Sequence, residues 1–191
     1  LGEPADYAQY AQQCQASGVD AIKIQPYVEW EAGINVLPYP IFPLRVIAAY
    51  NAVREAVGVD YPCMADNQGS YTFDEALRVG RVLDDLRFAW YESPMPETDA
   101  WVDRYIALAA ELRTPICGPE TYPDAYAPRI AWIAQRACHI ARISLYHGGL
   151  SACLQLATAC EEAGVPLTLH DVGPDAYPYL QLMGATSESL V

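Results

Sequence analysis

Apolar residues recur along the chain with two different periods, which predict helices that alternate with strands. Apolar positions spaced by three and four residues predict helices at 5–17, 45–57, 72–86, 99–112, 127–137 and 149–163. Short apolar runs, typical of buried strands, lie between them at 21–25, 61–65, 88–91, 115–117, 140–145 and 165–169. A further apolar run at 179–183 is a candidate seventh strand.

Turn-forming residues support several of these boundaries. Gly18 and Gly164 follow predicted helices, where glycine readily takes the left-handed conformation that ends a helix. Thr72 and Glu75 have the spacing of a capping box at a helix start. Residues 26–44 contain four prolines and several large aromatic residues, and we predict that they form a long loop that covers a functional site.

The predicted strands end at regular intervals. Their ends fall at 66, 92, 120, about 144 and 170, so the unit repeats every 24 to 28 residues. Strands and helices that alternate in this way predict right-handed crossovers and a parallel sheet. Both a doubly wound open sheet and a (β/α) barrel of the TIM type fit this pattern.

Two observations favour the barrel. No GxGxxG motif follows the first predicted strand, which weakens the dinucleotide-binding form of the open sheet. Polar residues stand at the carboxyl ends of the strands, the rim where barrel enzymes keep their chemistry. A full barrel typically needs about 250 residues. We therefore predict an α/β fold, one domain over residues 1–191, that is an incomplete TIM-type barrel of about six to seven βα units.

Three carboxylates follow three consecutive predicted strands, namely Asp66, Glu92 and Glu120. Adjacent parallel strands lie about 4.8 Å apart, so carboxylates at matching heights would converge. Any one of them alone fits a surface residue at a strand end. Three in register favour a cation between them, and an all-oxygen ligand set suits Mg²⁺.

Lys23 is the only lysine in the sequence, and it lies in a strand-like apolar run. In an extended strand Lys23 and Gln25 share one face, while Ile22 and Ile24 share the other. If the polar face lines the mouth of a barrel, the pair belongs to an active site. If that face meets solvent, Lys23 is an ordinary edge charge.

Composition excludes several classes of partner. The formal net charge is -13, which argues against binding nucleic acid or an anionic membrane surface. No apolar run of 18 residues is present, and 52% hydrophobic residues are enough for a sizeable core. The six cysteines lack any CxxC pair and lie mostly in apolar runs, which predicts free thiols in a reducing compartment, the cytoplasm. The start at Leu1 indicates an excerpt or a processed chain.

The order of the motifs resembles one known family. These motifs are Lys23, Asp66 in MADNQG, Glu92 in YESPMPE, Glu120 in CGPE, Gly148–Gly149 before a helix, and His170 after GVPLTL. Together they resemble the enolase superfamily, and within it the mandelate racemase and muconate lactonizing enzyme branch, especially the acid-sugar dehydratases. The resemblance extends over nearly the whole chain.

The resemblance implies a barrel that binds Mg²⁺ through Asp66, Glu92 and Glu120 and holds a small carboxylate substrate, a sugar acid. The shared step is removal of the proton next to the carboxylate, and in dehydratases a β-hydroxyl then leaves. His170 is the candidate base and Lys23 the candidate electrostatic partner, since the developing dianion needs nearby positive charge. Candidate substrate contacts are Gln25, Gln68 and His147.

Some residues depart from the family pattern. The second lysine of the family's KxK is Gln25 here, and an amide cannot accept a proton at useful pH. The aspartate that normally ends the sixth strand is also missing, because ARISLYHGG offers Ile143 or Ser144. The family's N-terminal capping domain and an eighth strand are not found in the sequence either.

These departures make a racemase improbable and leave three readings open. We expect a Mg²⁺-dependent lyase, a sugar-acid dehydratase. The alternative is a catalytically impaired relative that keeps the metal site and acts as a binding or assembly protein. A piece of a longer enzyme is compatible with both. An incomplete barrel leaves strand edges exposed, so we also expect a homo-oligomer.

Overall fold

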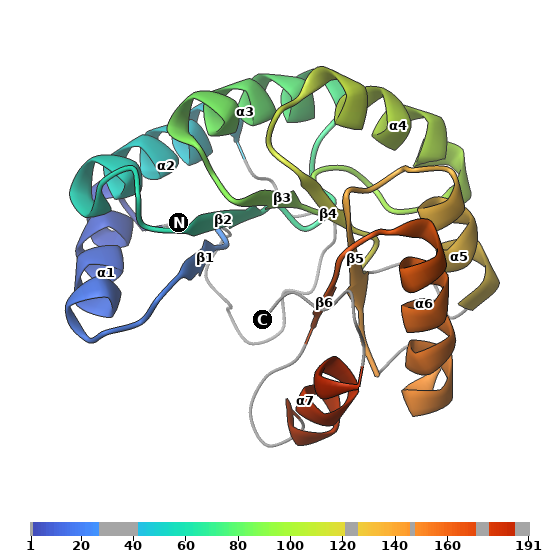
Figure 1. Ribbon diagram of the computed structural model, residues 1–191. Helices are drawn as coiled ribbons and strands as arrows, with labels where there is room; N and C mark the ends of the chain where they lie inside the picture. Colours follow the sequence, from blue (N-terminus) through green and yellow to red (C-terminus); the bar gives the residue numbers. More distant parts are fainter. Residues whose placement is uncertain (1, 27–41, 121–125, 146–147, 171–175, 186–191) are drawn as a thin grey trace, which may run out of the picture. The chain divides into compact units, whose positions relative to one another are not determined.

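The computed structural model describes residues 2–26, 42–120, 126–145, 148–170 and 176–185 (Figure 1). The chain divides into two compact units. The first comprises Leu1–Pro96 with Glu111–Pro115, and the second Glu97–Ala110 with Ile116–Val191. No helix in the described ranges is long and apolar enough to cross a membrane.

The first unit is a three-stranded parallel sheet with helices along one face (Figure 1). Its strands are β1 (Ile22–Ile24), β2 (Cys63–Asp66) and β3 (Trp90–Glu92). Its helices are α1 (Pro4–Ala16), α2 (Pro43–Val57) and α3 (Phe73–Leu86). Helix α2 packs between α1 and α3. Each strand is followed by a helix, so the sequence of elements is the predicted one.

Alternation along the strands separates the core of this unit from its polar face. Ile22 and Ile24 are buried, and on the neighbouring strands Ala65 and Tyr91 are fully buried. Because successive side chains point to opposite faces, Lys23 lies on the other face of β1, and Gln25, the residue after the strand, contacts Asp66 on the same side as Lys23, as predicted. One face of the sheet is therefore apolar core, and the other carries polar groups.

The capping box of α3 is confirmed. Thr72 is the N-cap, its hydroxyl oxygen accepts a hydrogen bond from Glu75 N at 3.4 Å, and Glu75 Oε2 accepts one from Thr72 N at 3.0 Å. Two backbone donors that have no partner inside the helix are thus satisfied. The helix ends at Leu86, and Arg87 takes the left-handed conformation after it. This fixes the start of the strand that carries Glu92.

The second unit repeats the same pattern. Its strands β4 (Ile116–Gly118), β5 (Ile140–Ile143) and β6 (Leu167–Leu169) pair in parallel in that order. Its helical elements are the 3₁₀ turn η1 (Asp99–Trp101), α4 (Val102–Glu111), α5 (Tyr126–Ala134), α6 (Gly149–Ala163) and α7 (Ala176–Gly184).

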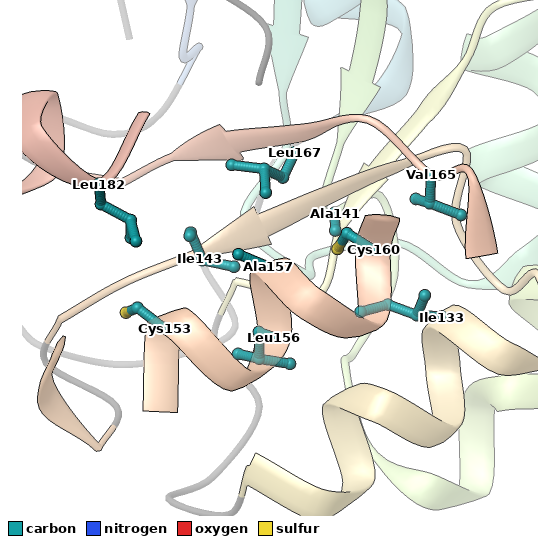
Figure 2. Packing of buried hydrophobic residues seen from close by; sticks show 10 residues of the cluster. All are labelled: Ile133, Ala141, Ile143, Cys153, Leu156, Ala157, Cys160, Val165, Leu167 and Leu182. Atoms are coloured by element: carbon teal, nitrogen blue, oxygen red, sulfur yellow. The ribbon is translucent and has the colours of Figure 1, made fainter. Parts of the chain in front are cut away.

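Helix α6 forms the centre of the hydrophobic core of this unit (Figure 2). Its side chains Cys153, Leu156 and Cys160 are almost completely buried and pack toward β5 and β6. The six cysteines, all in the described part of the chain, form no disulfide; five are buried, and Cys14 is half-buried. Burial raises the pKa of the Cys153 thiol, so it behaves as a small apolar side chain.

The candidate strand at 179–183 is wrong, because this segment lies in helix α7. An apolar run of five residues cannot by its period distinguish a strand from a buried helix. The leucines and glutamine of this segment favour a helix, and Pro178 lies in the first helical turn, where proline is tolerated. Leu182 is buried in the core of the unit (Figure 2).

Most of the predicted loop at 26–44 lies outside the described residues. Its final part differs from the prediction, since α2 already begins at Pro43. Proline suits the first position of a helix, because its fixed φ is helical and its missing N–H is not needed there. The six parallel strands that alternate with helices confirm the predicted fold class, an incomplete barrel of the TIM type. The single-domain boundary stays a prediction.

Candidate metal centre

Two buried carboxylates stand side by side in the first unit. Asp66 ends β2, Glu92 ends β3, and the two residues are direct partners in the parallel register. Their side chains have no exposed surface. Ionised carboxylates are costly to bury without positive charge or hydrogen-bond donors. The positive charges and hydrogen-bond donors around Asp66 and Glu92 therefore indicate what the site can bind.

Lys23 supplies positive charge to both carboxylates. Its Nζ lies 2.8 Å from Glu92 Oε1 and 3.1 Å from Asp66 Oδ2, and 22% of its side chain is exposed. It starts from β1, next to β2, and reaches across to the end of β3. The alternative of an ordinary edge charge in solvent is therefore wrong.

Asp66 also accepts hydrogen bonds from two amide side chains. Gln25 Nε2 donates to Asp66 Oδ2. The backbone N of Gln68 donates to Asp66 Oδ1 at 3.1 Å, and Gln68 Nε2 lies 3.3 Å from each carboxylate oxygen. Gln68 has a φ of 50°, a left-handed conformation that turns the chain straight after the strand. Two of the three predicted substrate contacts, Gln25 and Gln68, thus lie against Asp66, and their contact with a substrate stays a prediction.

Trp90 is a neighbour of the site that sequence reasoning missed. Its indole Nε1 donates to Glu92 Oε2 at 3.1 Å. The sequence could have indicated this contact, because Trp90 and Glu92 are two residues apart on one strand and such residues share a face. Trp90 therefore helps to fix the orientation of the Glu92 carboxylate, whose other oxygen contacts Lys23.

A buried network fixes the loop that follows Asp66. The backbone N of Asn67 donates to Glu92 O at 3.1 Å, and Tyr50 OH donates to Asn67 Oδ1 at 3.1 Å. Burial raises the pKa of Tyr50 well above its ordinary value, so its hydroxyl keeps its proton and stays a donor. Hydrogen bonds thus join the ends of β2 and β3 next to the two carboxylates.

The second unit brings the predicted base against the third carboxylate. His170 follows β6, and its Nε2 lies 2.9 Å from Glu120 Oε1. The Glu120 side chain is 6% exposed and the His170 side chain 35% exposed, so the imidazole is reachable from solvent. Arg142 on β5, which sequence reasoning missed, places Nε 3.9 Å from Glu120 Oε2. It precedes Ile143 and Ser144, the two positions considered for the family's aspartate.

Of the other two histidines, the structure describes only His139. His147 lies outside the described residues. His139 N donates to Ile116 O at 2.9 Å, and its Nδ1 accepts a hydrogen bond from Ile116 N at 3.0 Å. Burial lowers the pKa of His139, which keeps the ring neutral and able to accept that bond. His139 thus has a structural role in the pairing of β4 and β5.

The sequence matches the enolase C-terminal domain-like family over residues 6–191. The chain belongs to this family of the enolase superfamily, in the mandelate racemase and muconate lactonizing enzyme branch. It is similar to arabinonate dehydratase of Saccharolobus solfataricus, with 35% identity over 130 residues, or 65% of this chain and 33% of that protein. It is also similar to D-galactarolactone cycloisomerase of Agrobacterium fabrum, with 34% identity over 146 residues, or 74% of this chain and 37% of that protein.

A solved structure shares the fold over almost the whole chain. D-glucarate dehydratase from Agrobacterium tumefaciens, complexed with magnesium, matches with a TM-score of 0.83 and 30% identity. The match covers 99% of this chain and 47% of that one. The chain therefore spans between a third and a half of the length of these relatives.

Proposed function

We propose that the chain forms part of a Mg²⁺-dependent lyase that removes the proton next to the carboxylate of a sugar acid and eliminates water. The observation that carries this proposal is the fully buried pair of Asp66 and Glu92, in register on adjacent strands and bridged by Lys23. Family membership and the similarity to arabinonate dehydratase and D-glucarate dehydratase support the choice of reaction.

The donor groups fit Mg²⁺. Asp66 and Glu92 bring two negative charges to one face of the sheet, and the Lys23 ammonium that contacts them carries a single positive charge. Carboxylate oxygens are the ligands that Mg²⁺ prefers, completed by water and substrate oxygens. We propose Glu120, a buried residue that follows β4 in the second unit, as the third ligand. A bound Mg²⁺ would supply the charge that stabilises the dianion formed from the substrate.

His170 would act as the base. An imidazole ionises near neutral pH, so it can accept a proton and release it again. Glu120 Oε1, 2.9 Å from His170 Nε2, would stabilise the imidazolium that forms. The same imidazolium can return its proton to the departing β-hydroxyl, which leaves as water. The Lys23 ammonium would stabilise negative charge that develops on the substrate.

One observation favours the alternative of a catalytically impaired relative. Gln25 occupies the position of the family's second lysine, and its amide donates to Asp66 instead of offering a proton acceptor. A protein of this kind would keep the metal site and bind a carboxylate without removing a proton. The homo-oligomer and the cytoplasmic location stay predictions.

Exchange of the substrate's α-proton in heavy water distinguishes the two functions. A panel of sugar acids is incubated with the protein and Mg²⁺, and the loss of the α-proton signal is followed by NMR. We expect exchange or elimination with at least one acid, and a decrease of at least about 100-fold in His170→Asn. His139→Asn is the matched control, because His139 contacts the backbone of Ile116, and it should keep the rate.

Exchange that survives His170→Asn would contradict the proposed base. Metal binding without exchange for any acid in the panel would favour the impaired relative.

A further inference from the structure

Glu97, the second glutamate of the YESPMPE motif, is buried in the second unit, and the metal site described above gives no reason for its burial. The Glu97 side chain is buried, with 4% of the residue exposed. Its Oε2 accepts a hydrogen bond from the backbone N of Glu120 at 2.7 Å. A buried carboxylate is retained only where its contacts offset the cost of leaving water. This hydrogen bond goes to the residue proposed as the third metal ligand.

Arg129 on α5 holds the other side of the same peptide segment. Its Nη2 donates to Glu120 O at 2.8 Å, and its Nη1 lies 3.3 Å from Pro119 O. Burial lowers the pKa of the Arg129 guanidinium, and the negative charge of Glu97 acts in the opposite direction. The N–H of Glu120 and its C=O are thus held by two buried, oppositely charged side chains.

Gly118 leaves the space that Glu97 occupies. A Cβ at position 118 would lie 2.7 Å from Glu97 Oε1, closer than non-bonded atoms approach. The neighbouring atom is the end of a flexible side chain, so an alanine at this position would displace the Glu97 carboxylate. This gives a physical reason for the glycine in CGPE, since β4 ends where Glu97 must reach the backbone of Glu120.

We propose that Glu97 is a positioning residue, which together with Arg129 fixes the backbone of Glu120 so that its carboxylate is held ready for the metal. This inference rests on the proposed function, because it assigns Glu97 to the support of a Mg²⁺ ligand. Residues that orient metal ligands through hydrogen bonds typically change metal affinity by about 10- to 100-fold when they are mutated. Glu97 does not touch the metal or the substrate in this proposal.

The test is Mg²⁺ affinity, measured by calorimetry on the full chain and on variants shown to be folded by circular dichroism. Glu120→Gln establishes that wild-type binding depends on the proposed ligand. Glu97→Ala, which removes the acceptor, is expected to weaken binding at least about tenfold. Glu97→Gln keeps an acceptor oxygen at the same length and is expected to stay within about threefold of wild type. Glu162→Ala, an exposed residue with the same change of charge, is the matched control and should not alter the affinity.

Gly118→Ala gives an independent test that keeps the Glu97 side chain. It should weaken Mg²⁺ binding in the wild type and have little further effect in Glu97→Ala, because the added methyl group then meets no carboxylate. Such non-additive effects would support the proposal.

Three results would overturn it. The first is that Glu97→Ala binds Mg²⁺ as tightly as the wild type. The second is that Glu97→Gln and Glu97→Ala weaken Mg²⁺ binding equally. The third is that the effects of Gly118→Ala and Glu97→Ala on Mg²⁺ affinity are additive. Absence of wild-type Mg²⁺ binding, or binding unchanged by Glu120→Gln, would instead overturn the proposed metal site itself, and this inference with it.

Discussion

Replacing Lys23 by methionine removes the ammonium that bridges two buried carboxylates. Lys23 Nζ lies 2.8 Å from Glu92 and 3.1 Å from Asp66, whose side chains have no exposed surface. Methionine has a similar unbranched length but no charge, so Lys23→Met brings two neighbouring anions together without that cation. We expect a large loss in the free energy of unfolding.

The magnitude follows from the distances and the burial. Unit charges about 3 Å apart attract by about 5 kcal/mol at the effective dielectric constant of about 20 that suits protein sites. The cost of removing the ammonium from water offsets part of this attraction, and removing one partner of a buried ion pair typically costs about 3 to 5 kcal/mol. We expect a loss in this range for Lys23→Met. Glu92→Gln, which keeps an acceptor for Trp90 and leaves Lys23 with Asp66, should cost about 2 kcal/mol.

A double-mutant cycle isolates the interaction. Urea unfolding is measured in the presence of a chelator for the wild type, Lys23→Met, Glu92→Gln and the double variant. The double variant should lose at least about 1.5 kcal/mol less than the sum of the single variants, because one of the two anions is then absent. Arg81→Met is the control, since Arg81 and Glu111 form an ion pair whose side chains are 64% and 54% exposed. Its loss should stay within about 1 kcal/mol.

Added Mg²⁺ should restore more stability to Lys23→Met than to the wild type, because it supplies the missing positive charge. A loss for Lys23→Met no larger than that for Arg81→Met, or strictly additive effects in the cycle, would refute the reasoning.

Two further predictions concern stability. Thr72→Ala should lower the free energy of unfolding by about 1 kcal/mol through loss of the helix cap, as measured by urea unfolding, whereas an unchanged midpoint would contradict the role of the capping box. Burial lowers the pKa of His139 below its ordinary value of about 6.5, so the stability from its neutral form is complete above that pH and falls as the pH drops below it. Urea unfolding between pH 7.5 and 5.5 should therefore show a smaller loss of stability in His139→Gln than in the wild type, and equal losses would contradict this account.

The order of the elements and the place of the carboxylates could be predicted from local patterns. Strand ends that repeat every 24 to 28 residues fix the βα units, and the strict alternation of side chains puts Lys23 and Gln25 on one face. Asp66 and Glu92 end their strands as expected and are partners in the register. These features depend on period and position, which a sequence shows directly.

Other features could not be predicted, because they depend on contacts between distant segments. The run 179–183 carries the same apolar signal for a strand and for a buried helix, and packing of Leu182 on the core accompanies the helix. Glu97 and Arg129 act through the backbone of Glu120, and nothing in their sequence spacing indicates how far their side chains reach. Arg142 lies in an apolar strand, and its sequence position did not indicate that it would lie near Glu120.

Calorimetric titration of Mg²⁺ into the wild type and into Glu92→Gln tests the central claim most directly. The account predicts saturable binding by the wild type and a large loss of affinity in Glu92→Gln, whereas Glu111→Gln, at an exposed carboxylate, binds like the wild type. A folded wild-type protein that binds no Mg²⁺, or a Glu92→Gln variant that binds it as tightly as the wild type, would contradict the carboxylate metal centre.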